Sequence, residues 1–552
     1  MSSPQVATVR APAGGLMGWI DRNIFDLGRQ LQLSYLPPLM VYMAAGISGI
    51  TGIAGTFFVK EYLGLTAADL AALGFWAGLP WALKMPLGHL VDLLWKRKSL
   101  LVYTGALLLA TSVLIMVGLL TDRAAMEAIM PANRWFVLSA LLAPVGYVLQ
   151  DVVADAMTVE AVPRFDEQGK PLDEAARRIG HTTMQTLGRV AIVGGGILVS
   201  IVNVALFSDA AALPEAAKIA KYRQLYTLAL IIPLVSVMGV VLAGHLHRRE
   251  ARRLRDRGLS AVEVDRELHG HLERPPVNWW ILGGGLAFAA LSIAIGSSNV
   301  RFREEIIFAV SMGIVLFLML RLVRELDPVA RRTLVGTALV IFVFRAMPGP
   351  GPGASWWMID ELGFDQAFLA KLSLIGSSLA LLGMFLFRRF MAERSIAYTV
   401  GFLTILGSIL ALPSLAMYHG LHHWTAAHTG GVVDARFIAV IDTALESPLG
   451  QVAMIPMLAW IANSAPDRLK ATYFAVMASF TNLALSLSQL CTKYLNEIWN
   501  VQRVTKDQAT GLVKTPADYS QLGELFVASL VIGLVLPLLA IAFVRATRFR
   551  SA

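Results

Sequence analysis

Two aspartates four residues apart, Asp151 and Asp155, lie near the end of an apolar run that extends from Trp135 to Met157. The run is long enough to cross a bilayer, and a carboxylate at membrane depth is costly unless it faces a cavity or the interior of a helix bundle. The four-residue spacing places both carboxylates on one face of a helix. Acids in this setting mark ion or solute pathways, so the pair predicts a route for a transported solute.

Other charged side chains also fall inside apolar runs. Lys84 and Arg189 are expected at the depth of the two aspartates, which predicts a cluster of two acids and two bases. Asp442 and Glu446 repeat the four-residue spacing nearer the opposite side of the membrane. Arg345 precedes a Gly- and Pro-rich break at the same side, from where it could reach them.

These groups suggest two chemical tasks. Cations in a cavity of low dielectric attract an anionic solute, and the planar fork of arginine suits a carboxylate. Buried acids gain affinity for protons, which would couple transport to a proton gradient. Aromatic rings near Lys84 could stack on a flat heterocycle, and Phe75, Trp76 and Trp81 are the candidates.

The predicted substrate-binding residues are therefore Lys84, Asp151, Asp155, Arg189, Arg345 and Trp81. The predicted proton-coupling residues are Asp151, Asp155, Asp442 and Glu446. The alternative for all of these charges is a set of permanent salt bridges that hold helices together.

The composition indicates the elements that position these side chains. The chain has 552 residues, of which 56% are hydrophobic and 15% charged, and its mean hydropathy is +0.62. A helix needs about 20 mostly apolar residues to cross a bilayer. Such runs begin near Tyr35, Ala68, Leu100, Trp135, Ile179, Tyr226, Trp279, Ile306, Thr333, Ala367, Ile396, Phe437, Thr472 and Leu522. The sequence thus predicts an all-α membrane protein with about 14 transmembrane helices.

The distribution of Lys and Arg predicts the orientation, because short cytoplasmic loops carry an excess of cations. With both termini in the cytoplasm, the clusters at 96–98, 248–257 and 545–550 all lie inside. The net charge of +9 then follows from topology and needs no nucleic-acid partner. Residues 1–33 show no cleavable signal peptide, and they are expected to form an amphipathic surface helix or a mobile tail.

The predicted helices fall into two groups of six with a close pair between them. We expect an N-terminal segment at 1–33, a six-helix bundle at 34–246, a charged cytoplasmic loop at 247–277, an inserted helix pair at 278–325, a second six-helix bundle at 326–546 and a cytoplasmic tail at 547–552. The stretch from Gly88 through Asp92 to the basic residues Lys96, Arg97 and Lys98 resembles the cytoplasmic loop motif of the major facilitator superfamily. The resemblance implies alternating access and makes Gly88, Asp92 and Arg97 gating residues.

Five further stretches resemble the folate-biopterin transporter family of that superfamily. They are residues 58–66, 79–88, 150–160, 362–369 and 471–482. The resemblance implies a secondary active transporter for a folate or pterin, with protons as the coupling ion. Met85 shifts the proline that the family has after the lysine of its second helix. The Gln-Asp-x-x-x-Asp-Ala pattern at 150–156 is shared with muropeptide permeases, which are the alternative resemblance.

Enzymatic and ATP-driven functions are disfavoured, since the chain lacks a Walker motif, a zinc-protease pattern and a nucleophile elbow. We expect no cofactor and no metal, and four histidines between 419 and 428 are interpreted as loop residues. The expected partners are a small solute, protons and the lipid bilayer, around a monomer in a bacterial inner membrane. A non-transporting assembly or delivery factor on the same fold remains the second class of function.

Overall fold

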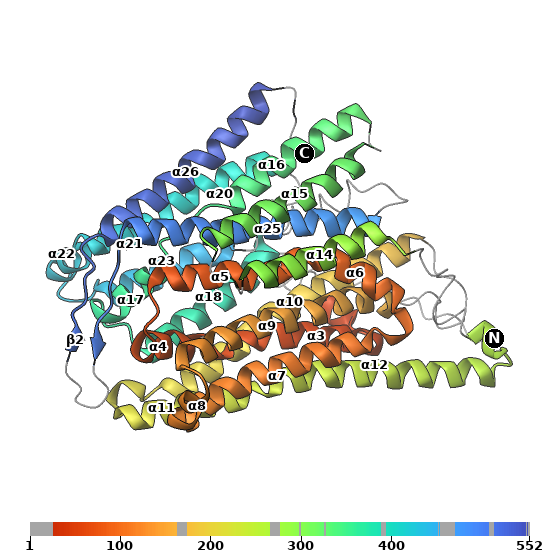
Figure 1. Ribbon diagram of the computed structural model, residues 1–552, viewed down its shortest axis with the longest axis horizontal. Coiled ribbons are helices and arrows are strands. Elements are labelled where there is room, and N and C mark those ends of the chain that lie inside the picture. The colour runs from red at the N-terminus through yellow and green to blue at the C-terminus, as the bar shows by residue number, and fades with distance from the viewer. Residues whose placement is uncertain are drawn as a thin grey trace, which may run out of the picture.

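The computed structural model is built almost entirely of long helices (Figure 1). It describes residues 26–549 except 163–173, 265–276, 297, 299, 325–326, 388–393, 451, 453–469, 507–512 and 548. Most of the predicted N-terminal surface helix therefore lies outside the described residues, of which α2 (Asp26–Arg29) is the first element.

The first group of helices covers the predicted N-terminal bundle. It comprises α3 (Leu36–Gly46), α4 (Gly52–Tyr62), α5 (Ala67–Ala82), α6 (Lys84–Leu93), α7 (Ser99–Thr121), α8 (Arg123–Ile129), α9 (Ala132–Ala161), α10 (Glu174–Phe207), α11 (Glu215–Ala229) and α12 (Ile231–Asp256). The helix α12 runs about ten residues into the segment that the sequence assigned to the charged central loop. Arginines in its last turn favour this extension, because cations stabilise the C-terminal end of a helix.

The second group follows the inserted pair. The pair is α14 (Trp279–Gly296) and α15 (Arg303–Val323). The bundle comprises α16 (Pro328–Arg345), α17 (Pro352–Asp360), α18 (Gln366–Leu386), α20 (Ile396–Leu410), α21 (Leu412–Tyr418), α22 (Leu421–His428), α23 (Ala435–Glu446), α25 (Lys470–Ile498) and α26 (Leu522–Ala546). Two short antiparallel strands, β1 (Thr505–Lys506) and β2 (Val513–Thr515), form a hairpin before α26.

A helix begins at or near each of the fourteen predicted positions. Among the described residues, nine stretches are long and apolar enough to cross a membrane by length and composition. The all-α membrane architecture is therefore confirmed. The number of crossings stays a prediction.

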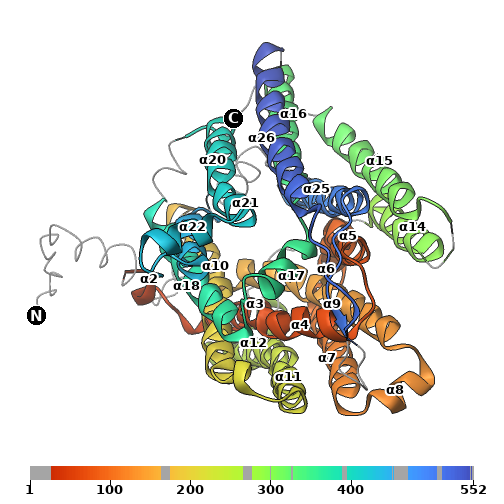
Figure 2. The same ribbon diagram turned by 90° about the vertical axis from the view of Figure 1, so that its left-hand side faces the viewer.

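The two halves meet along two long helix contacts. The helix α5 packs against α25, and α10 packs against α18. The halves converge at the end where α4, α17 and α22 lie, and they diverge toward the ends of α12 and α26 (Figure 1). Seen from the converging end, α14 and α15 lie at the periphery beside α5, α6 and α25 (Figure 2).

Proline divides the second crossing into α5 and α6. Pro80 lies in the last turn of α5, where its ring disturbs the regular helix. The backbone N–H of Leu83 then bonds to the carbonyl of Pro80 at 3.0 Å, and α6 restarts at Lys84. The break places the ammonium group of Lys84 at a turn between two helices.

Three consecutive glycines, Gly194, Gly195 and Gly196, lie on α10, which packs against α3, and small residues allow helices to approach closely. A methyl group on Gly195 would lie 2.8 Å from the backbone of Gly46, a distance that backbone atoms do not tolerate. A methyl group on Gly194 would meet nothing within 4 Å. The close packing therefore depends on one glycine of the three.

We expect Gly195→Ala to destabilise the protein by about 1–3 kcal/mol because α3 and α10 would have to separate. The matched variant Gly194→Ala should instead be neutral or stabilising by roughly 0.5–1 kcal/mol, since alanine favours helix. Thermal unfolding in detergent measures both changes. Equal melting temperatures for the two variants would contradict the assigned contact.

Candidate functional site

Lys84 lies between the two aspartates that the sequence singled out. Its Nζ is 2.6 Å from Oδ2 of Asp151 and 2.8 Å from Oδ2 of Asp155. The hydroxyl of Tyr42 on α3 donates to Oδ1 of Asp155 at 2.7 Å. Side chains from α3, α6 and α9 thus meet at one point, and the four-residue spacing on α9 brings both carboxylates to the same cation.

The two carboxylates differ in their access to water. The side chain of Asp151 is 18% exposed, that of Lys84 19% and that of Asp155 41%. One lysine neutralises only one of the two carboxylates, and an uncompensated charge at this depth is expensive. Arg189 on α10 lies near enough for its charge to act on Asp151 and Tyr42. Its part in a four-group site stays a prediction. Asp155 is the member that water and solutes can reach most easily.

The three aromatic residues near Lys84 lie in different surroundings. Phe75 is completely buried in an apolar cluster, so its ring is not available to a ligand. Trp76 points to the inserted pair and donates its Nε1 to Glu304 on α15 at 3.1 Å. The backbone carbonyl of Trp81 accepts from Asn482 Nδ2 on α25 at 3.2 Å, and Trp81 is half-buried. Its stacking role stays a prediction.

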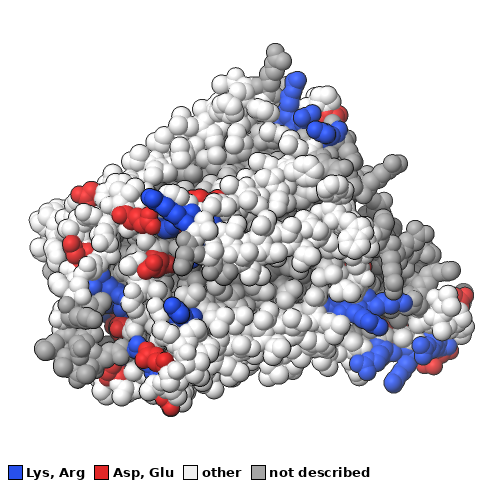
Figure 3. Space-filling view, in the orientation of Figure 1, with Lys and Arg blue, Asp and Glu red and all other residues white. Residues whose placement is uncertain are grey.

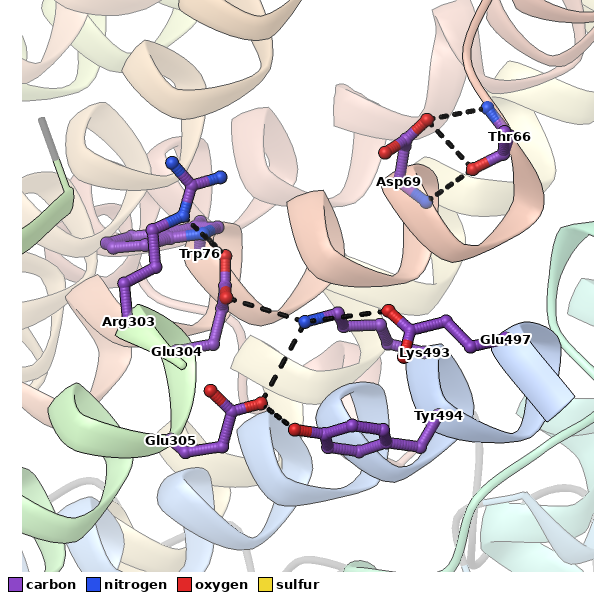
Figure 4. Close-up of polar contacts among 9 residues, drawn as sticks. All are labelled: Thr66, Asp69, Trp76, Arg303, Glu304, Glu305, Lys493, Tyr494 and Glu497. Carbon is purple, nitrogen blue, oxygen red and sulfur yellow. Dashed lines mark hydrogen bonds and ion pairs between the residues drawn. The ribbon is translucent and has the colours of Figure 1, made fainter. Parts of the chain in front are cut away.

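Glu304 is the centre of a second group of charges, which the sequence analysis missed (Figure 4). Besides Trp76 it contacts Arg303 at 2.9 Å and Lys493 of α25 at 3.5 Å. Lys493 lies 3.8 Å from Glu305, whose carboxylate also accepts from the hydroxyl of Tyr494. These contacts fasten the inserted pair to both halves, through α5 and through α25.

The charged residues of the second half lie on two helices, Arg345 on α16 and the acidic pair on α23. Arg345 donates its Nε to the carbonyl of Thr481 on α25 at 3.2 Å. Asp442 is half-buried and Glu446 is exposed, one turn apart on α23. The glycine-rich break after Arg345 is real: α16 ends there, and Gly351 adopts φ +75° before α17 begins.

The predicted gating motif forms the turn between α6 and α7. Asp92 is half-buried at the end of α6, and Arg97 is exposed. Lys98, the last cation of the motif, pairs with Glu160 at the end of α9 and lies 4.0 Å from the ring of Trp95. Glu160 lies in the 150–160 stretch, so its position in that motif was the available signal.

A buried ion pair joins the halves at their converging end. Nζ of Lys60 on α4 is 2.5 Å from Oδ1 of Asp360 on α17, with side-chain exposures of 7% and 15%. The hydroxyl of Tyr519 donates to the other oxygen of Asp360 at 2.5 Å. Burial and this hydrogen bond raise the pKa of Tyr519, so the phenol remains a donor at neutral pH.

Arg503, near the β hairpin, adds a third contact across the same end. Its Nη1 donates to the carbonyl of Val59 on α4 at 2.8 Å, and its guanidinium lies 4.9 Å from the ring of Trp356. The sequence analysis identified neither Arg503 nor Asp360 as a residue that joins the halves. Lys60, a lysine near the end of an apolar helix, was the only visible signal.

The comparison with protein families decides the identity of the chain. A model described as the BT1 family matches residues 45–548, which is most of the chain. The chain belongs to the BT1 family. This BT1 protein is 23% identical to a folate-biopterin transporter of Synechocystis sp. over 466 residues, covering 84% of this chain and 74% of the relative. A putative folate transporter 2 of Plasmodium berghei is 22% identical over 149 residues, covering 27% of this chain and 32% of the relative.

Solved transporters share the fold of this BT1 protein. A POT family transporter in complex with a thioalcohol-conjugated peptide has a TM-score of 0.55 and 11% identity, covering 95% of this chain and 96% of that one. The nucleoside transporter NupG has a TM-score of 0.51 and 11% identity, covering 93% and 99%. The major facilitator type fold and the family resemblance are confirmed. The BT1 protein is a multi-pass membrane transporter and not an enzyme.

We expect Lys60→Met and Asp360→Asn each to favour opening of the converging end. Removing one partner of a buried pair costs roughly 3–5 kcal/mol, which shifts a two-state equilibrium by a factor of about 100 or more. The distance between the halves can be measured by pulsed electron paramagnetic resonance. Spin labels are attached to cysteines that replace the exposed residues Asn133 and Thr429, in a Cys491→Ser background.

The single variants should show longer distances, and the charge swap that combines Lys60→Asp with Asp360→Lys should restore the original distribution. Glu127→Gln is the control, because it breaks an ion pair with Arg123 inside one half. Unchanged distances in both single variants would show that the pair does not hold the halves together.

Proposed function

We propose that this protein is a secondary active transporter that moves a folate or pterin across the membrane by alternating access, coupled to protons. The observation that carries the proposal is Lys84 held between Asp151 and Asp155 at a break in an apolar helix. The family relatives named as folate transporters support the choice of solute.

The cluster suits a pterin because a carboxylate of the cluster can exchange its lysine partner for the solute. The amino group and ring N–H of a pterin form a paired donor edge that one carboxylate can accept side by side. Asp155, the more exposed carboxylate, can leave Lys84 to accept this edge while Asp151 keeps the ammonium neutralised. A solute carboxylate would instead be attracted by Lys84 and Arg189.

Proton coupling follows from the same exchange of partners. When a solute takes Lys84 away from Asp155, a proton on Asp155 removes the negative charge that is left without its partner. A solute that binds at Lys84 changes this balance, so solute and proton occupancy affect each other. Asp442 and Glu446 are proposed as a second proton-accepting pair in the other half.

The surface charge supports a cytoplasmic position for both termini. Lys and Arg gather at the diverging end of the molecule, at the end of α12 and near the ends of α16 and α26, whereas the converging end carries mixed charges (Figure 3). An excess of cations is typical of the cytoplasmic side. The described conformation would then face the cytoplasm, with Lys60 and Asp360 closing the outer side.

We expect Lys84→Ala and Asp155→Asn each to abolish uptake of folate into proteoliposomes under an imposed pH gradient. Loss of the cation leaves two carboxylates uncompensated, at a cost of roughly 3 kcal/mol or about 100-fold in rate. Asp155→Asn should also reduce solute counterflow without a gradient, because the asparagine amide offers one acceptor oxygen where the paired donor edge of a pterin needs two. Arg223→Ala, which removes an exposed cation of α11, is the control. Normal uptake by both site variants would refute the site.

Arg345→Ala should weaken transport of folate more than that of biopterin, because only folate carries the carboxylates that a guanidinium binds as a fork. The ratio of the apparent KM values for the two solutes measures this difference. An equal loss for both solutes would assign Arg345 to helix packing through Thr481.

A further inference from the structure

Gln185 on α10 lies beside the charged cluster and is exposed, although α10 packs against α3, α9 and α18. It belongs to the candidate membrane span Thr183–Phe207. Polar side chains within a span face the interior of the bundle or a water-filled cavity, because lipid offers them no partner. Nε2 of Gln185 donates to Oγ1 of Thr158 on α9 at 3.3 Å. The amide therefore lies against the helix that carries both aspartates of the cluster.

The facing surfaces of α9 and α10 carry matching rows of polar side chains. Asp151, Asp155 and Thr158 are spaced three to four residues apart on α9, so they share one face of that helix. Gln185 and Arg189 are four residues apart on α10 and likewise share a face. Gln185 contacts Thr158. Arg189 is near enough for its charge to act on Asp151. Asp155 lies between these two contacts along α9, so its carboxylate and the amide of Gln185 belong to one polar surface.

The hydrogen bonds of Thr158 fix the orientation of the Gln185 amide. A hydroxyl has one proton to donate. Thr158 donates this proton to the backbone carbonyl of Asp155 at 2.7 Å. Its hydroxyl can therefore only accept from Gln185, so the Nε2 end of the amide faces α9 and Oε1 points away from that helix. Because Nε2 has a second proton, the exposed amide still offers one donor and one acceptor side by side.

The geometry points to Gln185 as the residue that selects the oxidation state of the pterin, in favour of the dihydro and tetrahydro forms. The inference rests on the proposed function, in which Asp155 accepts the 2-amino and N3–H edge of the ring. The neighbouring edge consists of N1, an acceptor, and N8, which carries a proton only in the reduced forms. One carbon joins N1 to N8, as one carbon joins the oxygen and nitrogen of an amide. Gln185 can therefore form two parallel hydrogen bonds, from Nε2 to N1 and from N8–H to Oε1.

An oxidised pterin, such as biopterin or folic acid, offers a lone pair at N8 in place of the proton. Oε1 of Gln185 would then face a second acceptor and lose its hydrogen bond to water without a replacement. Turning the amide does not help, because Oε1 would face the lone pair of N1 and Nε2 would leave Thr158. A site that bonds an N–H of its solute discriminates against the analogue that lacks it. Reduced pterins should therefore bind more tightly than oxidised pterins with the same side chain.

Isothermal titration calorimetry of the full-length protein in detergent, without oxygen, compares 7,8-dihydrobiopterin with biopterin. The two probes differ only by the hydrogens at N8 and C7. Wild type should bind the dihydro form about tenfold more tightly, roughly the value of one hydrogen bond. Gln185→Met keeps the length of the side chain without its amide, so it should lose this preference through weaker binding of the dihydro form. Gln224→Met changes an exposed glutamine of α11 and is the matched control, which should keep the preference.

Thr158→Val tests the positioning role of Thr158. It should weaken binding of dihydrobiopterin about two- to threefold and leave biopterin unchanged, because nothing then holds the amide in its binding orientation. The readout is the ratio of the two dissociation constants, which a smaller fraction of folded protein does not alter.

Equal affinities of wild type for the two pterins would overturn the inference, as would an unchanged ratio in Gln185→Met. The proposed function would survive either result. A wild type that binds neither pterin would overturn the proposed function and this inference with it.

Discussion

The structure depends on a positive charge kept in an apolar helix by two negative ones. Lys84 at membrane depth would be costly alone, and Asp151 and Asp155 together would repel each other. The contact of Lys84 with the two aspartates lowers the cost of placing these charges at membrane depth, and it fixes the position of α6 against α9. Arg189 on α10 adds a second positive charge that acts on Asp151, so two bases and two acids make up this group.

The same constraint explains how the halves are held at their converging end. Lys60 and Asp360 are both buried, and each compensates the other across the boundary between α4 and α17. Water is largely excluded from this ion pair, so the attraction between the two groups is strong while the halves are in contact. Once the halves separate, the ammonium and the carboxylate each need water in place of the partner. An ion pair of this kind suits a contact that opens and closes, since water can replace the partner without leaving a buried charge.

The inserted helix pair has a role in packing that its lipid-exposed composition alone does not reveal. Glu304 joins α15 to Trp76 on α5 and to Lys493 on α25, two helices that belong to different halves (Figure 4). At the other end of the pair, Gly285 touches Pro86 beside the break in the second crossing. The pair therefore contacts helices of both halves and lies beside the break at which Lys84 begins α6.

Local patterns in the sequence were enough for the helices, the approximate boundaries, the family and the meeting of Lys84 with the two aspartates. Apolar runs determine where helices cross a membrane, and a four-residue spacing determines which side chains share a face. The pairing of Lys60 with Asp360 and the junction at Glu304 were decided only by the tertiary structure. Each joins residues that are far apart in the chain, and their contact depends on how whole helices rotate and pack, which hydropathy and spacing within one helix do not specify.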